Sequence, residues 1–375
     1  MSFNCFLSQF KNLRPRFEVP QSTLLEWLSR AHCLTKAFQD NKNLDASNLT
    51  VEELNKMRRF VNRFACDSTK IGSRGVQTDD PAETEYNKLQ IYKISKESLA
   101  GVKMAERTHF FSNQCNQKFE EFYPEGTQAP EHLLHITCTG YASPSGAQHL
   151  ISRRQWSKQT KVTHAYHMGC YAALPSIRLA QGLTQSQFSS VDLVHTEICT
   201  LHLDPSNHSP EQIVVQSLFA DGFIKYQASA TRPPEGFEVL RIDEFIVPDS
   251  EKLMTWLTAD FGMQMTLSKE VPAVIAKYIE NFVSEFQFDT HSCLFAIHPG
   301  GPRIIESLQD VLKLQTEQIA HSKQVLFDYG NMSSATLPHI WQNILNDPMV
   351  ESGKLIMSLA FGPGLTIFGG LLKKI

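Results

Sequence analysis

The sequence predicts an α/β fold. Short apolar runs alternate with segments whose apolar residues recur at helical spacing, the pattern of strands and helices packed in layers. The chain has 375 residues, of which 42% are apolar and 20% charged, values typical of a globular protein with a large core. A turn-rich stretch at residues 233–236 (Pro-Pro-Glu-Gly) divides the alternation, and we place a domain boundary there, between residues 1–235 and 236–375.

The first third of the chain predicts helices. Residues 23–26 (Thr-Leu-Leu-Glu) and 50–53 (Thr-Val-Glu-Glu) match the capping box, in which a hydroxyl and a carboxylate satisfy free amides at a helix start. A third helix is expected within residues 95–123, where an apolar stripe at helical spacing consists of Phe111, Cys115, Phe119 and Phe122. Residues 79–85 are expected to form a loop.

Strands and helices alternate in the remainder. The predicted buried strands are residues 133–137, 193–199, 293–297 and 324–327, and the predicted helices are residues 171–183, 271–286 and 304–314. Residues 355–372 approach the length of a membrane span, but Gly-Pro-Gly interrupts them at 362–364. Two buried strands joined by a tight turn are therefore expected, and no membrane span.

Charge and cysteine content exclude several classes of function. The formal net charge is −4 and no long block of like charge occurs, so nothing predicts a nucleic-acid partner. The N-terminus lacks the pattern of a secretory signal, which favours a cytoplasmic location. Eight cysteines without a CxxC pair predict reduced thiols rather than a disulfide framework or a metal site.

Cys170 is the first candidate catalytic residue. A helical stripe begins just after it, so its thiol is expected at a helix N-terminus, where free amides and the helix dipole favour the thiolate. Gly169 permits a sharp backbone turn before it. The alternative for Cys170 is a small buried apolar residue without chemistry.

His298 and Asn331 are the other two candidates. His298 ends an apolar run and enters a Pro-Gly-Gly-Pro turn, a position that can face a cleft; a structural histidine is the alternative. Asn331 follows a glycine and precedes Ser333 and Ser334, either of which could cap the next helix. A capped turn without function is the alternative there.

Taken together, these segments resemble one family. Gly-Cys at 169–170, His-Pro-Gly-Gly-Pro at 298–302 and Gly-Asn-Met-Ser-Ser at 330–334 stand in the order found in chalcone synthases and bacterial type III polyketide synthases. Further matches are Thr-Cys-Thr-Gly-Tyr at 137–141, Leu-Phe-Ala-Asp-Gly at 218–222, Leu-Ser-Lys-Glu-Val-Pro at 267–272 and Phe-Gly-Pro-Gly-Leu-Thr at 361–366. The resemblance extends from about residue 50 to the end.

The resemblance implies a thiolase fold, with two similar α/β halves in a layered αβαβα arrangement. Cys170 would lie in the first half and receive the starter acyl group as a thioester. His298 and Asn331, in the second half, would bind the malonyl thioester carbonyl and stabilise the enolate formed when carbon dioxide leaves. An imidazolium at His298 would also lower the pKa of the Cys170 thiol.

The resemblance also implies a substrate cavity. Phe219 corresponds to a gatekeeper between the substrate tunnel and the cavity, with core packing as the alternative, and Met265 stands at the second gatekeeper position. The remaining cavity positions are Thr139, Cys199, His202, Ser333 and the loop around Gly364. Glu197, in an apolar strand, is interpreted as a buried, hydrogen-bonded carboxylate.

Substrate delivery is implied by a basic cluster. It comprises Arg58, Arg59, Arg63, Lys70 and Arg74, near where the family holds the phosphates of coenzyme A; a solvated helix face is the alternative. Ser68 stands in place of one family lysine, and an acidic acyl carrier protein would also suit the cluster. The resemblance further implies a homodimer and no metal or organic cofactor.

Three functions follow. The first is an iterative synthase that extends an acyl starter with malonyl units and cyclises the product to a resorcinol, a phloroglucinol or a pyrone. The second is a single-round condensing enzyme that joins carrier-bound acyl chains, which the departures at Ser68 and Met265 favour. The third is a catalytically silent partner subunit, which the intact Cys170, His298 and Asn331 oppose.

Overall fold

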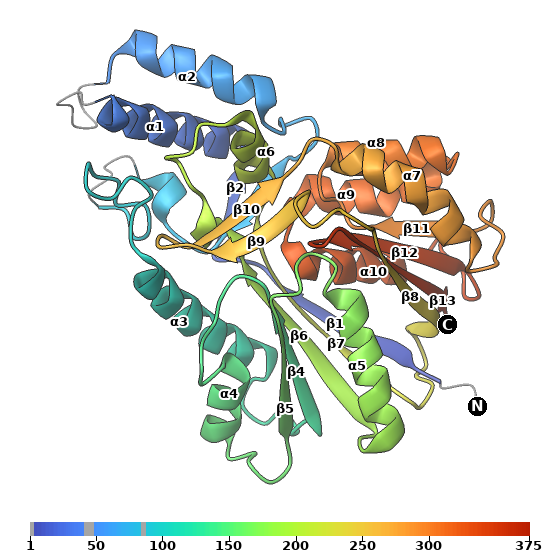
Figure 1. Ribbon diagram of the computed structural model, residues 1–375. Coiled ribbons are helices and arrows are strands. Elements are labelled where there is room, and N and C mark those ends of the chain that lie inside the picture. Colours follow the sequence, from blue (N-terminus) through green and yellow to red (C-terminus); the bar gives the residue numbers. More distant parts are fainter. Residues whose placement is uncertain (1–3, 41–48, 84–87) are drawn as a thin grey trace.

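The computed structural model describes residues 4–40, 49–83 and 88–375 (Figure 1). A nine-stranded mixed sheet has the order β11-β12-β13-β8-β1-β7-β6-β4-β5. Its strands are β1 (Phe6–Leu13), β4 (His132–Thr137), β5 (Lys161–Tyr166), β6 (Ser190–Ile198), β7 (Asp221–Ser229), β8 (Phe237–Ile246), β11 (Leu294–Ile297), β12 (Leu355–Gly362) and β13 (Thr366–Lys374). β4 is parallel to β5 and β6, β11 is parallel to β12, and the other pairs are antiparallel.

Helices and two small two-stranded sheets surround the large sheet. The helices are α1 (Gln21–Gln39), α2 (Val51–Phe64), α3 (Met104–Phe122), α4 (Gly146–Arg154), α5 (Ala173–Ser186), α6 (Pro210–Leu218), α7 (Val271–Ser284), α8 (Pro302–Val311), α9 (Ala320–Tyr329) and α10 (Thr336–Asn346). One small sheet pairs β2 (Phe17–Pro20) with β3 (Ser73–Val76), which α1 and α2 separate along the chain. The other is a hairpin of β9 (Met254–Thr258) and β10 (Met263–Leu267). The predicted α/β class is therefore confirmed.

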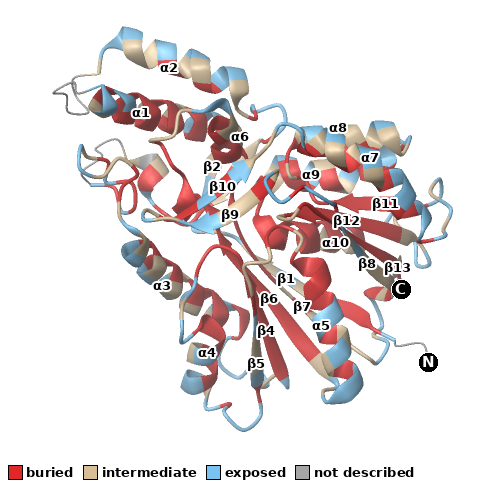
Figure 2. Cartoon of the chain, viewed as in Figure 1, coloured by how far each residue is buried: buried red, intermediate tan, exposed pale blue. Residues whose placement is uncertain are grey.

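The apolar core forms three clusters that correspond to layers. The central cluster holds the buried faces of α5 and α10 together with strands from both ends of the sheet. A second cluster packs α1 and α3 against the N-terminal strands, and a third packs α7, α8 and α9 against the C-terminal strands. Figure 2 shows these buried positions concentrated inside the molecule. Two helices thus lie between two α/β halves, as the thiolase fold requires.

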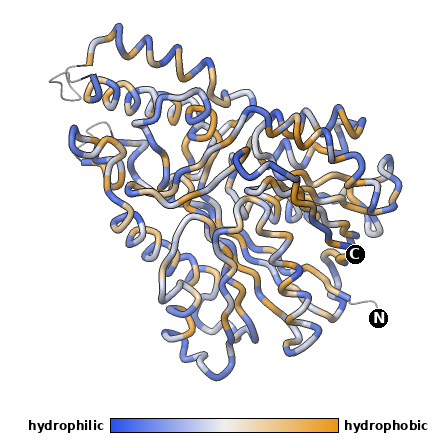
Figure 3. The backbone as a smooth tube through the Cα atoms, viewed as in Figure 1, coloured by the Kyte–Doolittle hydropathy of each residue, from blue (hydrophilic) through white to orange (hydrophobic). Residues whose placement is uncertain are grey.

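Most helices and strands lie at the residues predicted from the sequence. The predicted capping box at Thr50 is present, since its side chain accepts from the Glu53 amide and the Glu53 carboxylate accepts in return. Helix α2 buries only Met57 and Val61 and alternates hydrophilic and hydrophobic residues (Figure 3). The run at residues 355–372 forms β12 and β13, paired directly across the turn. Among the described residues, no helix is long and apolar enough to cross a membrane.

Some local predictions are wrong. Helix α1 begins at Gln21 after Pro20, without a side-chain cap, so the segment starting at Thr23 is not a helix start. Residues 324–327 belong to helix α9 rather than to a strand, because the helix buries Ser322, Val325 and Leu326 at helical spacing. Residues 80–82 of the expected loop form a short 3₁₀ helix, and residues 84 and 85 lie outside the described residues.

Candidate active site

Cys170 lies in the turn between β5 and α5, three residues before the helix begins at Ala173. Gly169 has φ +87°, and a Cβ on it would stand 2.7 Å from Cδ of Pro363, so both the turn and the close approach require glycine. The Gly169 amide donates to Sγ of Cys138 at 3.0 Å. This bond fixes the backbone that presents Cys170.

His298 and Asn331 reach the same place from the C-terminal half. His298 follows β11, and its amide donates to the Leu359 carbonyl at 2.7 Å. Asn331 pairs with Phe219 in an isolated parallel bridge, and its Oδ1 accepts from the Ser333 amide at 2.9 Å. Cys170, His298 and Asn331 all line one cleft of about 1030 Å³. The structure therefore brings the three predicted catalytic residues together.

Burial controls the protonation of the site. It raises the pKa of the Cys170 thiol to about 12, although a hydrogen bond to Ser333 Oγ (3.8 Å) acts in the opposite direction. Burial also lowers the pKa of His298 to about 3, and among the described residues neither of its ring nitrogens has a hydrogen-bond partner. Burial therefore opposes the expected thiolate–imidazolium pair, because it favours the neutral form of both groups.

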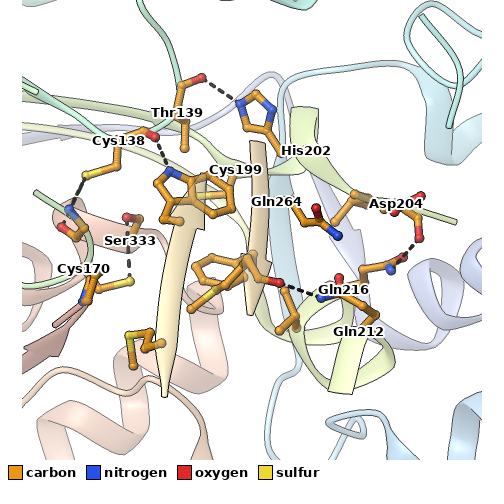
Figure 4. A pocket seen from close by; sticks show the side chains of 18 of the residues that line it. Cys138, Thr139, Cys170, Cys199, His202, Asp204, Gln212, Gln216, Gln264 and Ser333 are labelled. Carbon is orange, nitrogen blue, oxygen red and sulfur yellow. Dashed lines mark hydrogen bonds between the residues drawn. The ribbon is translucent and has the colours of Figure 1, made fainter. Parts of the chain in front are cut away.

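A second, inner chamber adjoins the cleft. Cys170, Phe219 and Met265 line both spaces, so the two predicted gatekeepers stand at the boundary beside the thiol. The inner chamber has a free volume of about 40 Å³, and its walls include the predicted Thr139, Cys199, His202 and Ser333 (Figure 4). Gly364 is not among these lining residues, because its neighbour Pro363 faces the chamber and its own carbonyl accepts from Ser250.

Two residues of this chamber were not predicted from the sequence. Trp256, on β9, lines the chamber, donates from Nε1 to the Cys138 carbonyl at 2.7 Å and packs edge-on against His202. Cys138 links this indole to the turn before Cys170, because its carbonyl accepts from Trp256 Nε1 and its Sγ accepts from the Gly169 amide. The motif at 137–141 could have indicated Cys138, whereas a lone tryptophan in a short hairpin carries no such signal.

Glu197 organises the chamber from behind. Its carboxylate accepts from the Cys138 amide, from Thr139 Oγ1 at 2.8 Å and from the Ser334 hydroxyl. Burial raises its pKa, while these hydrogen bonds lower it. The interpretation of Glu197 as a buried, hydrogen-bonded carboxylate agrees with this geometry. Ser334 bonds Glu197 and neither serine caps α10, so the predicted serine cap is wrong.

The basic cluster does not act as one surface. Arg58 is held by an ion pair with Glu26 at 2.5 Å. Arg74 is only 1% exposed, and its guanidinium donates to the carbonyls of Gln216 and Phe219. Its predicted contact with coenzyme A phosphates is wrong, because strand β3 turns the side chain into the core. Arg59 is exposed outside the cleft lining, whereas Arg63 and Lys70 line the cleft.

Family models match most of the chain. The chalcone and stilbene synthase N-terminal domain matches residues 39–229, and the C-terminal domain matches residues 239–375. Type III polyketide synthase C of Arabidopsis thaliana is 27% identical over 260 residues, covering 65% of this chain and 67% of its own length. Probable polyketide synthase 1 of Dictyostelium discoideum is 30% identical over 258 residues, covering 65% of this chain but only 8% of that protein.

Two solved structures have the same fold. The type III polyketide synthase domain of a type I/III hybrid from Dictyostelium superposes with a TM-score of 0.79 at 23% identity, covering 99% of both chains. PKS-I of the brown alga Ectocarpus siliculosus superposes with a TM-score of 0.78 at 21% identity, covering 99% of this chain and 98% of that one.

Proposed function

Because the chain belongs to the chalcone and stilbene synthase family of type III polyketide synthases, we propose that it condenses acyl thioesters on Cys170. The observation that carries the proposal is the meeting of a thiol, an imidazole and a carboxamide in one cleft, contributed by both halves of the fold. The substrates are an acyl starter and malonyl units, carried as thioesters of coenzyme A or of an acyl carrier protein. The chemistry uses no metal or organic cofactor.

Loading of Cys170 is the first proposed step. The sulfur attacks the starter thioester carbonyl, the carrier leaves as its thiol, and an acyl–Cys170 thioester forms. The thiol must release its proton during the attack, because burial holds it protonated at neutral pH. His298 lines the same cleft, and we assign it the transfer of this proton from the Cys170 thiol to the leaving carrier thiol.

Decarboxylation and condensation follow. Since Asn331 Oδ1 already accepts from the Ser333 amide, its NH₂ group remains to donate to a substrate oxygen. We assign this donor and a protonated ring nitrogen of neutral His298 to the malonyl thioester carbonyl. Loss of carbon dioxide leaves an enolate, whose oxygen these donors stabilise. The enolate carbon attacks the acyl–Cys170 carbonyl and displaces the thiolate, so the chain grows by two carbons.

The size of the inner chamber limits the length of the product. An iterative synthase would form a resorcinol, a phloroglucinol or a pyrone there. A free volume of about 40 Å³ has room for about three waters, since one water needs about 10–15 Å³ of such volume. This observation favours a short product, and it keeps single-round condensation as the second candidate. Longer products require Trp256 or Met265 to move aside.

Acylation of Cys170 tests the function. Intact-protein mass spectrometry after incubation with acyl thioesters should show an added acyl mass, and peptide mapping should place it on Cys170. The Cys170→Ala variant should lose both the adduct and the released product, while Asn331→Ala should keep the adduct and lose decarboxylation. Product formation by Cys170→Ala at the native rate would exclude both candidates. A released ring compound would select iteration over single-round transfer.

We also propose a cytoplasmic homodimer, which the family resemblance implies. Light scattering during gel filtration should give twice the chain mass of 42.4 kDa.

A further inference from the structure

Helix α6 ends at the active site. Its last residue, Leu218, precedes Phe219, which lines both the cleft and the inner chamber. The Leu218 carbonyl accepts from the Asn331 amide at 2.9 Å, and the Ala220 amide donates to the Asn331 carbonyl at 2.8 Å. The end of α6 therefore fixes the backbone of two predicted site residues, the gatekeeper Phe219 and the catalytic Asn331.

Two buried side chains supply the donors that this helix end requires. The last carbonyls of an α-helix have no partner within the helix. Arg74 Nη1 donates to the carbonyls of Gln216 at 2.8 Å and Phe219 at 2.7 Å. Gln21 Nε2 donates to the Ser217 carbonyl at 2.9 Å. Arg74 is 1% exposed and Gln21 is fully buried, so solvent has little access to compete for these carbonyls.

The guanidinium of Arg74 is held on several sides. Its Nε donates to Gln21 Oε1 at 2.7 Å, which orients the plane of the group. Its stem packs against Gly330, the residue before Asn331, where a Cβ would stand 3.0 Å from Arg74 Cγ. A cation is also favourable at the C-terminus of a helix, because the helix dipole is negative there. Arg74 thus contacts Phe219 itself and the residue next to Asn331.

We propose that Arg74 is a positioning residue for decarboxylation, which fixes Phe219 and Asn331 relative to Cys170. The inference rests on the proposed function, in which the Asn331 NH₂ group donates to the malonyl thioester carbonyl. Arg74 is not among the residues that line the cleft or the inner chamber, so it acts through its contacts and not on the substrate. This role replaces the coenzyme A contact expected from the sequence.

The step that needs Asn331 should be the step that depends on Arg74. The enolate oxygen gains charge during decarboxylation, and a donor that moves by about 1 Å costs about 100-fold in rate. Loading of Cys170 uses the sulfur and His298, and Arg74 has its hydrogen bonds elsewhere. Loss of the Arg74 guanidinium should therefore separate two half-reactions of the same active site.

Arg74→Lys tests the role with the charge retained. Lysine carries one ammonium group and cannot reproduce the planar fork that donates to Gln21 and to two carbonyls at once. Release of carbon dioxide from malonyl-coenzyme A measures decarboxylation. Intact-protein mass spectrometry measures acylation of Cys170, with whichever of acetyl-, hexanoyl- and benzoyl-coenzyme A loads the native protein fastest. The variant should lower kcat for decarboxylation about 30- to 100-fold, with KM and the saturated acylation rate within about threefold of native.

Arg107→Lys is the matched control. Arg107, on α3, is also fully buried. Its guanidinium donates to the carbonyls of Ala100, Val102 and Leu201, which lie outside α6 and outside the segment around Asn331. The control should lower the melting temperature by a similar amount and leave the ratio of the two half-reactions within about twofold of native. Circular dichroism at the assay temperature verifies that both variants are folded.

Gln21→Met is the milder variant, and it replaces Arg74→Lys if that protein does not fold. It removes the acceptor of Arg74 Nε and the donor to Ser217 while the guanidinium stays, so kcat for decarboxylation should fall about threefold to tenfold and acylation should not. Equal losses in both half-reactions, no loss in either, or a rise in KM alone would overturn the positioning role. A native protein that neither acylates Cys170 nor decarboxylates malonyl-coenzyme A would instead overturn the proposed function.

Discussion

Replacing Trp256 by alanine should lengthen the product. The indole lines a chamber with about 40 Å³ of free volume, and removing a large side chain opens at least about 150 Å³. A two-carbon ketide unit with its oxygen takes up roughly the volume of two waters, about 60 Å³. The enlarged chamber should therefore admit about two further extensions before release.

The substitution should be tolerated by the fold. It removes the hydrogen bond to the Cys138 carbonyl, which contributes about 1 kcal/mol. The apolar loss is below the 3–5 kcal/mol of a fully buried tryptophan, because Trp256 is partly exposed. A total of about 2–3 kcal/mol leaves a protein of ordinary stability folded.

Product analysis by liquid chromatography and mass spectrometry measures the effect. The native protein, Trp256→Ala and Trp256→Phe are incubated with one acyl starter and malonyl thioester, and released and enzyme-bound products are compared. Trp256→Phe keeps a ring against His202 and should retain the native distribution. The Trp256→Ala variant must remain folded and still acylate Cys170. If it then releases products of native length, the indole does not limit product length.

Two further outcomes are expected. The rate of Cys170 alkylation by iodoacetamide should rise about tenfold per pH unit from pH 7 to 9. Burial raises the thiol pKa to about 12, so the thiolate fraction stays small over this range. A rate for the Cys170 peptide that levels off below pH 8 would show a thiolate of low pKa instead. Arg74→Met should lower the free energy of unfolding by about 2–6 kcal/mol, about 1–3 kcal/mol for each buried acceptor left unpaired, since the Gln216 and Phe219 carbonyls lose their donor. Urea denaturation measures this loss, and a cost below 1 kcal/mol would contradict it.

The spacing of apolar residues over long segments made much of the fold predictable. The errors arose in segments of only a few residues. The Gly-Pro-Gly break identified β12 and β13 because it divides an apolar run into two strand-length pieces. Residues 324–327 were mistaken for a strand because two adjacent buried residues, Val325 and Leu326, fit either period. Only the wider spacing from Ser322 distinguishes a helix there.

The residues of the candidate site that lie in sequence motifs were predictable. The ordered motifs identified Cys170, His298 and Asn331, which the fold brings into one cleft. The protonation of Cys170 was not predictable, because local sequence indicates a helix start but not the depth of burial around it. Arg74 shared a basic stretch with Arg63, yet the chain leaves α2 at Phe64 and enters β3, which turns the guanidinium inward.

Strand β1 makes the assembly of this fold a long-range event. Phe6 pairs with Ser229 on one side and with Glu238 on the other, so the strand joins the two halves of the sheet only after most of the chain has been synthesised. Until then both of its edges are unpaired, and such non-local strand pairing slows folding and exposes edges to aggregation. The residues of the active site, which come from both halves, therefore meet late in folding, and chaperones that shield β1 should increase the yield of active protein.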